Sequence, residues 1–270
     1  PFHVEDKYVN PYRDNPAIPN PNFYGMIANF DDNLGRLRKM LQAEGLEENT
    51  IIIFLTDNGS SAGATLDGQG NVTKGYNAGM RGMKVSQYEG GHRVPLFIKF
   101  PERTGIAPSV HHELTAYTDI LPTLVELVGG EVNVDYPLDG ISLLPLLQEG
   151  KQEELTDRYV VVDTQRDDLP LKGKRSCVMQ GAWRLVDGKF LYNLANDPGQ
   201  RENLIEGEAT RAAAMQEAYE SWWSRLEGDI ALTNRITVGH PAENPSLLTS
   251  HDWHTEKDPP WNQKQIRAGK

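Results

Sequence analysis

The fold is decided by a short apolar run with an abrupt polar end, TIIIFLTDNG (residues 50–59). Its continuous β-branched part predicts a buried parallel strand over residues 50–56. In open α/β sheets, ligands bind at the carboxyl ends of strands. Asp57 and Asn58 stand at that end, and a carboxylate beside an amide oxygen suits calcium or magnesium better than zinc. On these residues alone, an Asn-Gly turn without a ligand is the simpler alternative.

Helical and strand patterns alternate on both sides of this strand. Apolar residues at three- and four-residue steps predict an amphipathic helix over residues 22–45. A second strand is expected over residues 94–100 and another helix over residues 119–129. This order predicts an α/β domain over residues 1–150, with a mostly parallel sheet flanked by helices.

Beyond residue 150 the pattern changes. Short strand candidates separated by turns, followed by one helix, predict a small antiparallel α+β subdomain over residues 151–230. Residues 231–270 are rich in Pro, Asn and His and predict an irregular tail. The single cysteine, Cys177, falls in one of the expected strands and is interpreted as a buried structural thiol. One cysteine excludes an internal disulfide and a zinc cluster built from cysteines.

Composition excludes several classes of protein. The chain has 270 residues, 27 basic and 38 acidic, for a formal charge of −11 and no basic stripe. This charge argues against nucleic acid or an anionic membrane as partner. No apolar run approaches the roughly 18 residues of a membrane span. The chain opens at Pro1 without a visible signal peptide, which favours a processed or truncated sequence.

Three phrases stand in order around the first strand and its polar end. After Asp57-Asn58-Gly59 come RGMK (residues 81–84) and EGGHRVP (residues 89–95). Together they resemble the sulfatase family of the alkaline phosphatase superfamily. Further segments fit the same family in the same order, over roughly residues 1–205: FDDNLG (30–35), DILPT (119–123), DGISLLP (139–145), LYNL (191–194), DP (197–198) and ENL (202–204).

The resemblance implies an alkaline-phosphatase-like fold and calcium-dependent hydrolysis of sulfate esters, on a sulfated carbohydrate or an aryl sulfate. Asp57 and Asn58 match the family's ligands for one divalent cation, usually calcium. Lys84 matches the lysine that contacts the sulfate ester, where an ammonium offsets charge on the sulfuryl group; a solvated loop lysine is the alternative. His92 stands at a variable position, facing either substrate or the scaffold.

The family's nucleophile has no counterpart here. Sulfatases convert a Cys or Ser in a Cys/Ser-x-Pro/Ala-x-Arg phrase to formylglycine, and neither this phrase nor the family's paired Asp ligands occurs. Because the missing parts all belong upstream, we expect a carboxyl-terminal portion that is inactive alone. The expected partners are a sulfated substrate and the missing N-terminal half, with a homo-oligomer left open. The family suggests an exported setting, whether periplasmic, extracellular or lysosomal.

Three further questions stay open at this point. His251, Trp253 and His254 in the tail either stack on a sugar at the mouth of the site or wrap the scaffold. A phosphonate or phosphate ester hydrolase of the same superfamily is the alternative enzyme. A non-catalytic binding module is the alternative if no upstream half exists. A sheet with an open edge and an exposed apolar face predicts an isolated chain that is unstable or self-associating.

Overall fold

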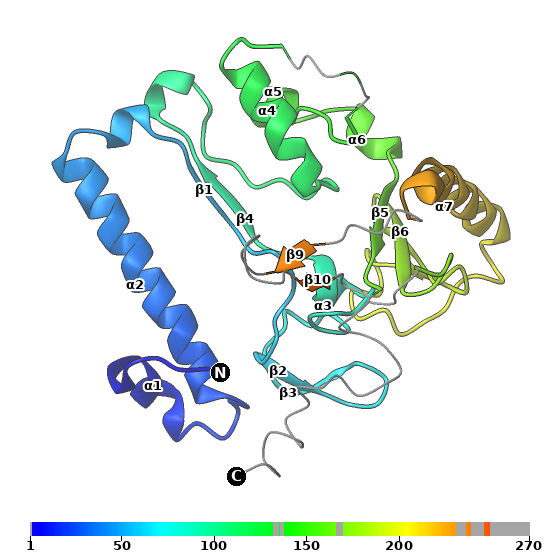
Figure 1. Cartoon of the computed structure of the whole chain (residues 1–270), viewed down its shortest axis with the longest axis horizontal. Helices are drawn as coiled ribbons and strands as arrows, with labels where there is room; N and C mark the ends of the chain where they lie inside the picture. Colours follow the sequence, from blue (N-terminus) through cyan, green and yellow to red (C-terminus); the bar gives the residue numbers. More distant parts are fainter. Residues whose placement is uncertain are drawn as a thin grey trace.

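The computed structural model describes residues 2–131, 135, 138–165 and 170–230, and the backbone of 236–238 and 246–248 (Figure 1). The described helices are α1 (Asp6–Arg13), α2 (Pro21–Ala43), α3 (Glu89–His92), α4 (Ile120–Leu127), α5 (Leu144–Glu149), α6 (Glu154–Asp157) and α7 (Ala209–Ile230), with 3-10 turns η1 (Glu47–Asn49), η2 (Glu102–Thr104) and η3 (Tyr117–Asp119). The described strands are β1 (Ile52–Leu55), β2 (Ala64–Leu66), β3 (Val72–Gly75), β4 (Leu96–Lys99), β5 (Val160–Asp163), β6 (Ser176–Gln180), β7 (Trp183–Val186), β8 (Phe190–Asn193), β9 (Ile236–Val238) and β10 (Ser246–Leu248).

The long helix α2 confirms the amphipathic helix predicted over residues 22–45. Asn20 caps its start, because its side chain accepts a hydrogen bond of 3.1 Å from the Phe23 amide, and Pro21 occupies the first turn. Helix α1 crosses the same end of α2 (Figure 1). A Cβ on Gly25 would lie 3.0 Å from the Tyr8 carbonyl oxygen, so the two backbones approach closely there.

Strands β1 and β4 form a two-stranded antiparallel ladder in which Leu55 pairs with Leu96 and Ile52 with Lys99. The prediction of a buried parallel strand over residues 50–56 is therefore wrong in two respects, since β1 is half-buried and its described partner runs the other way. A continuous apolar run indicates burial but not the direction of the neighbouring strand. Direction is set by the connection, and residues 56–95 leave β1 and enter β4 at the same end of the ladder.

Strands β5, β6, β7 and β8 form an antiparallel sheet in sequence order, and α7 covers one face (Figure 1). This arrangement confirms the predicted small antiparallel sheet with one covering helix. The core between them is built from Val178, Leu185 and Leu191 of the sheet and Met215 and Tyr219 of the helix, all buried. Among the described residues, every strand pair is antiparallel.

Cys177 lies on the opposite face of this sheet, packed with Met179, Val186 and Tyr192. It is fully buried, and burial raises the pKa of its thiol, so it stays protonated and inert. The structural interpretation of this thiol is therefore confirmed.

The tail is described only in part. His251, Trp253 and His254 lie outside the described residues. The domain boundaries at residues 150 and 230 stay predictions. Within the described part of the chain, no helix is both long and apolar enough to span a membrane.

Candidate active site

Asp57 and Asn58 follow the carboxyl end of β1, where the backbone is tied to a distant segment. The Tyr117 hydroxyl lies 3.0 Å from the Thr56 carbonyl oxygen and 2.8 Å from the Asp57 carbonyl oxygen, and its one proton is shared between them. Burial, and secondarily the Asp57 charge, raise the pKa of Tyr117, so it remains a donor. The Asp57 side chain is exposed beside this anchor.

A second segment, residues 81–93, lies directly against the turn after Asn58. The Gly59 amide donates to the Gly91 carbonyl oxygen and the Lys84 amide donates to the Ser60 carbonyl oxygen, each at 2.9 Å. A Cβ on Gly59 would lie 1.8 Å from the Gly90 carbonyl oxygen, a distance that no real contact reaches. The close approach therefore requires glycine at position 59, and the two segments form one unit.

The predicted site residues divide between two pockets. Asp57, Asn58 and His92 line a groove of about 2120 Å³. The exposed Lys84 lines a neighbouring pocket of about 430 Å³ together with Arg81. The structure thus brings three predicted residues to one groove and joins Lys84 to them through its backbone, not through its ammonium group.

Beneath this groove lies a buried carboxylate, Glu89, whose side chain is 1% exposed. Arg184 donates from Nε to Glu89 Oε1 at 2.5 Å, and Arg93 Nη1 lies 3.6 Å from Oε2. His92 Nε2 lies 3.9 Å from Oε1, and burial lowers the pKa of His92, so the ring is neutral at pH 7. His92 Nε2 and Glu89 Oε2 are buried without a hydrogen-bond partner. A substrate contact for His92 stays a prediction.

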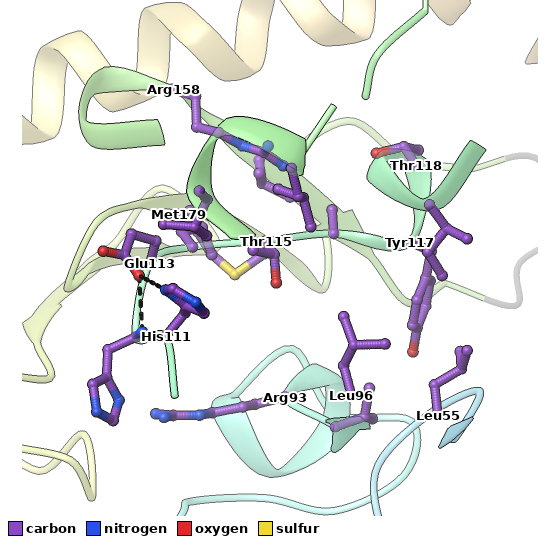
Figure 2. Close-up of a pocket in the computed structure, with 18 of the residues that line it drawn as sticks. Leu55, Arg93, Leu96, His111, Glu113, Thr115, Tyr117, Thr118, Arg158 and Met179 are labelled. Atoms are coloured by element: carbon purple, nitrogen blue, oxygen red, sulfur yellow. Dashed lines mark hydrogen bonds and ion pairs between the residues drawn. The ribbon is translucent and has the colours of Figure 1, made fainter. Parts of the chain in front are cut away.

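Sequence reasoning did not place the segment around residues 109–117 at the groove. Figure 2 shows Arg93, His111, Glu113 and Tyr117 around the cavity. The Ser109 hydroxyl lies 2.7 Å from His111 Nε2, and His111 Nδ1 lies 4.0 Å from Glu113 Oε2. A short run such as His-His-Glu carries no signal for this placement. The segment is held at the groove by a tertiary contact, the hydrogen bond from Tyr117 to the Asp57 carbonyl oxygen, and these two residues lie sixty positions apart in the sequence.

The donors at the end of β1 fit a hard cation in kind. Asn58 directs its amide nitrogen to the Gly59 carbonyl oxygen at 3.0 Å, which leaves Oδ1 available beside the Asp57 carboxylate. Calcium takes six to eight oxygen ligands. No group of three or more His, Cys, Asp or Glu among the described residues is placed to hold a metal ion, so a metal role for Asp57 and Asn58 stays a prediction.

Comparison with known proteins decides the family. The sequence profile of sulfatases matches residues 1–130, which include the Asp57–Ser60 turn and the Arg81–Arg93 segment. Over these 130 residues, the chain belongs to the sulfatase family. This sulfatase chain is 32% identical over 133 residues to the uncharacterized sulfatase YdeN of Escherichia coli, covering 49% of the chain and 22% of YdeN. It is 29% identical over 255 residues to arylsulfatase A of Homo sapiens, and the match covers 83% of this chain and 47% of arylsulfatase A.

Solved sulfatase structures share its fold. Ps i-CgsB, solved in complex with k-i-k-neocarrahexaose, superposes with a TM-score of 0.67 at 23% identity, over 82% of this chain and 47% of that one. A phosphonate monoester hydrolase from Silicibacter pomeroyi superposes with a TM-score of 0.53 at 18% identity, over 85% of this chain and 45% of the hydrolase. These neighbours confirm the expected alkaline-phosphatase-like fold class. The sulfatase chain spans less than half the length of each of these relatives.

Proposed function

We propose that this chain forms part of a sulfuric ester hydrolase that acts on a sulfated carbohydrate or an aryl sulfate. The observation that carries the proposal is the pair of 2.9 Å backbone hydrogen bonds joining the Asp57–Ser60 turn to the Lys84–Gly91 segment. These two segments contain the residues that resemble the metal and sulfate ligands of sulfatases, and they come together from separate parts of the sequence.

Each residue has a distinct part in the proposed chemistry. The Asp57 carboxylate and Asn58 Oδ1 would hold calcium, which when bound stabilises negative charge on the sulfate oxygens. The exposed Lys84 side chain would reach the sulfate ester as a flexible point charge and offset charge on the departing oxygen. Because the chain carries a formal charge of −11, these cations must also overcome repulsion of an anionic substrate.

The nucleophile and further metal ligands would come from polypeptide outside these 270 residues. We propose a formylglycine segment of the same sulfatase as that partner, in an exported protein. Two features support a polypeptide partner: β1 and β4 each have one outer edge unpaired among the described residues, and Phe97 of β4 is 66% exposed. Such an edge is a template for strand addition.

The test compares the sulfate and the phosphate ester of one fluorescent alcohol, which is the leaving group in both. A polypeptide that includes this chain and the preceding coding sequence would be assayed with 4-methylumbelliferyl sulfate and 4-methylumbelliferyl phosphate, with and without EDTA. Sulfate hydrolysis that EDTA abolishes is expected. Lys84→Ala should lower kcat about 10²–10³-fold, as loss of a charge-stabilising donor does.

Lys74→Ala is the matched control, since Lys74 is an exposed lysine on the β2–β3 hairpin. Preference for the phosphate ester would favour the phosphonate or phosphate hydrolase instead. Absence of both activities, together with a start codon close to Pro1, would favour a binding module. Equal rates for Lys84→Ala and Lys74→Ala would refute the proposed role of Lys84.

A further inference from the structure

The Arg81–Arg93 segment is held from outside, by the four-stranded sheet and the turn that follows it. Gln87 Nε2 donates to Asp187 Oδ2 at 3.0 Å, and Arg81 Nη1 donates to the Tyr192 hydroxyl at 3.1 Å. Two more contacts from this subdomain reach Glu89. The proposed sulfate and metal ligands therefore rest on a structure that lies a hundred residues later in the sequence.

Arg184 on β7 fixes the position of the Glu89 side chain. Its guanidinium is itself oriented by hydrogen bonds from Nη1 to the carbonyl oxygens of Gly181, at 2.7 Å, and Trp183, at 2.8 Å. The side chains of Arg184 and Glu89 are 7% and 1% exposed. A charge-assisted bond with both partners buried and one partner locked leaves Glu89 little freedom to move.

Gln200 holds both ends of the same segment. Its Oε1 accepts a hydrogen bond of 2.9 Å from the Glu89 amide, while its carbonyl oxygen accepts one of 2.9 Å from Arg81 Nη1. Gln200 is fully buried and has φ of +52°. A left-handed backbone is unfavourable for a residue that carries a side chain, so the surrounding structure maintains this conformation against its local preference.

Glu89 is linked to the turn at Asp57 through backbone hydrogen bonds and close backbone contacts. Next to Glu89, the Gly90 amide donates to the Arg81 carbonyl oxygen at 2.8 Å, and the Gly91 carbonyl oxygen receives the Gly59 amide. A Cβ on Gly90 would lie 2.1 Å from the Gly82 carbonyl oxygen, so backbone rests directly on backbone. A shift of Glu89 must therefore move Gly91 and the turn that carries Asp57 and Asn58.

We propose that Gln200 and Arg184 are positioning residues for the proposed site: they set the place of the Asp57–Ser60 turn and of Lys84 through Glu89. This inference rests on the proposed function for the identity of the ligands. It assigns the small antiparallel subdomain a role in ligand placement, beyond its own folding.

The test uses a variant that removes one hydrogen-bond acceptor while keeping side-chain length, Gln200→Met. Met215→Ala is the matched control. Met215 lies on α7 and is buried against the sheet, so its truncation should destabilise the subdomain without removing a contact to residues 81–93. Both variants would be studied at a temperature where each is fully folded. The measurements are amide hydrogen exchange at Gly59, Lys84 and Gly91, and binding of Tb³⁺ as a luminescent calcium probe.

Gln200→Met should accelerate exchange at these three amides tenfold or more and weaken Tb³⁺ binding by a similar factor. Met215→Ala should leave the three exchange rates and the Tb³⁺ affinity unchanged, apart from any change that its lower global stability accounts for. The comparison therefore separates a positioning role from a general loss of stability. Unchanged exchange and affinity in Gln200→Met would overturn the inference. Absence of Tb³⁺ binding in the unaltered chain would count against the proposed metal site alone, because the exchange result still decides whether Gln200 positions the turn.

Discussion

Gly59 is the residue at which two distant parts of the site come closest. Its amide bonds to the Gly91 carbonyl oxygen, and a methyl group on its Cα would overlap the Gly90 carbonyl oxygen at 1.8 Å. Gly35 on α2 is the opposite case, since nothing lies within 4 Å of its virtual Cβ. The same residue type thus has a steric role at one position and none at the other.

Gly59→Ala and Gly35→Ala should change stability in opposite directions. Gly59→Ala is expected to destabilise by more than about 2 kcal/mol, because backbone atoms cannot yield as a side chain does. Gly35→Ala should stabilise by about 0.5–1 kcal/mol through helix propensity. Urea unfolding of both variants measures this, and equal midpoints would contradict the close approach at Gly59.

His92 predicts a pH dependence of stability. Burial lowers its pKa below the ordinary 6.5, so between the two pKa values the unfolded chain binds more protons than the folded one. Stability should therefore fall as pH drops from 7.5 to 5.5, by at most about 1.4 kcal/mol per pH unit from this group.

His92→Gln should flatten that slope, while His112→Gln, at an exposed position, should leave it intact. Urea unfolding at the two pH values measures both. An identical slope in His92→Gln and the unaltered chain would show that the ring titrates alike in both states.

At the scale of elements, β8 and α7 share one hydrophobic core with an alternating strand pattern. Leu191 is fully buried toward α7, whereas the preceding residue, Phe190, is 38% exposed. Successive side chains of a strand point to opposite faces. Substitutions at these two neighbours therefore compare a buried and a partly exposed side chain on the same strand.

Leu191→Ala should destabilise the subdomain by about 2–5 kcal/mol, since it removes buried methyl groups and leaves a cavity. Phe190→Ala should cost clearly less. The check is chemical denaturation followed by tryptophan fluorescence, as Trp223 belongs to the same core. A larger effect at Phe190 would mean that the faces of β8 are assigned wrongly.

At the scale of the whole molecule, large apolar side chains remain exposed on α2 and β4. Ile27 and Phe30 of α2 and Phe97 of β4 are each more than half exposed. The Phe97 ring stacks on Phe54 of β1 and the Phe30 ring packs against it at a tilt, so both extend one aromatic cluster to the surface. Exposed patches of this kind mark interaction surfaces or aggregation sites.

Phe97→Ser should reduce self-association and dye binding by the isolated chain. Sedimentation velocity and fluorescence of 1-anilinonaphthalene-8-sulfonate measure the two effects. Leu171→Ser is the control, because Leu171 is similarly exposed but lies in the segment before β6, away from this cluster. A monomeric chain with a sharply cooperative melt and no dye binding would contradict the expectation.

Local signals predicted the elements well. Spacing of Phe23, Ile27 and Phe30 predicted α2, and the Asp187-Gly188 pair predicted the turn between β7 and β8, where both residues have positive φ. The ordered sulfatase phrases located Asp57, Asn58 and Lys84, and the first two do line one groove. The helix spacing and the turn pair depend on neighbours within a few residues, and the family phrases depend on their order along the chain, which is why a single sequence carries them.

The sequence by itself determined the family, the helices and strands, and the residues offered as ligands. Only the tertiary structure decided that β4 runs antiparallel to β1, that Tyr117 anchors the Asp57 backbone, and that Gln200 supports Glu89 across 111 residues. The type of a hydrogen-bonding residue does not tell which distant residue will be its partner. The pairing is fixed when the whole chain buries its polar groups at once, and that is a property of the fold rather than of any segment.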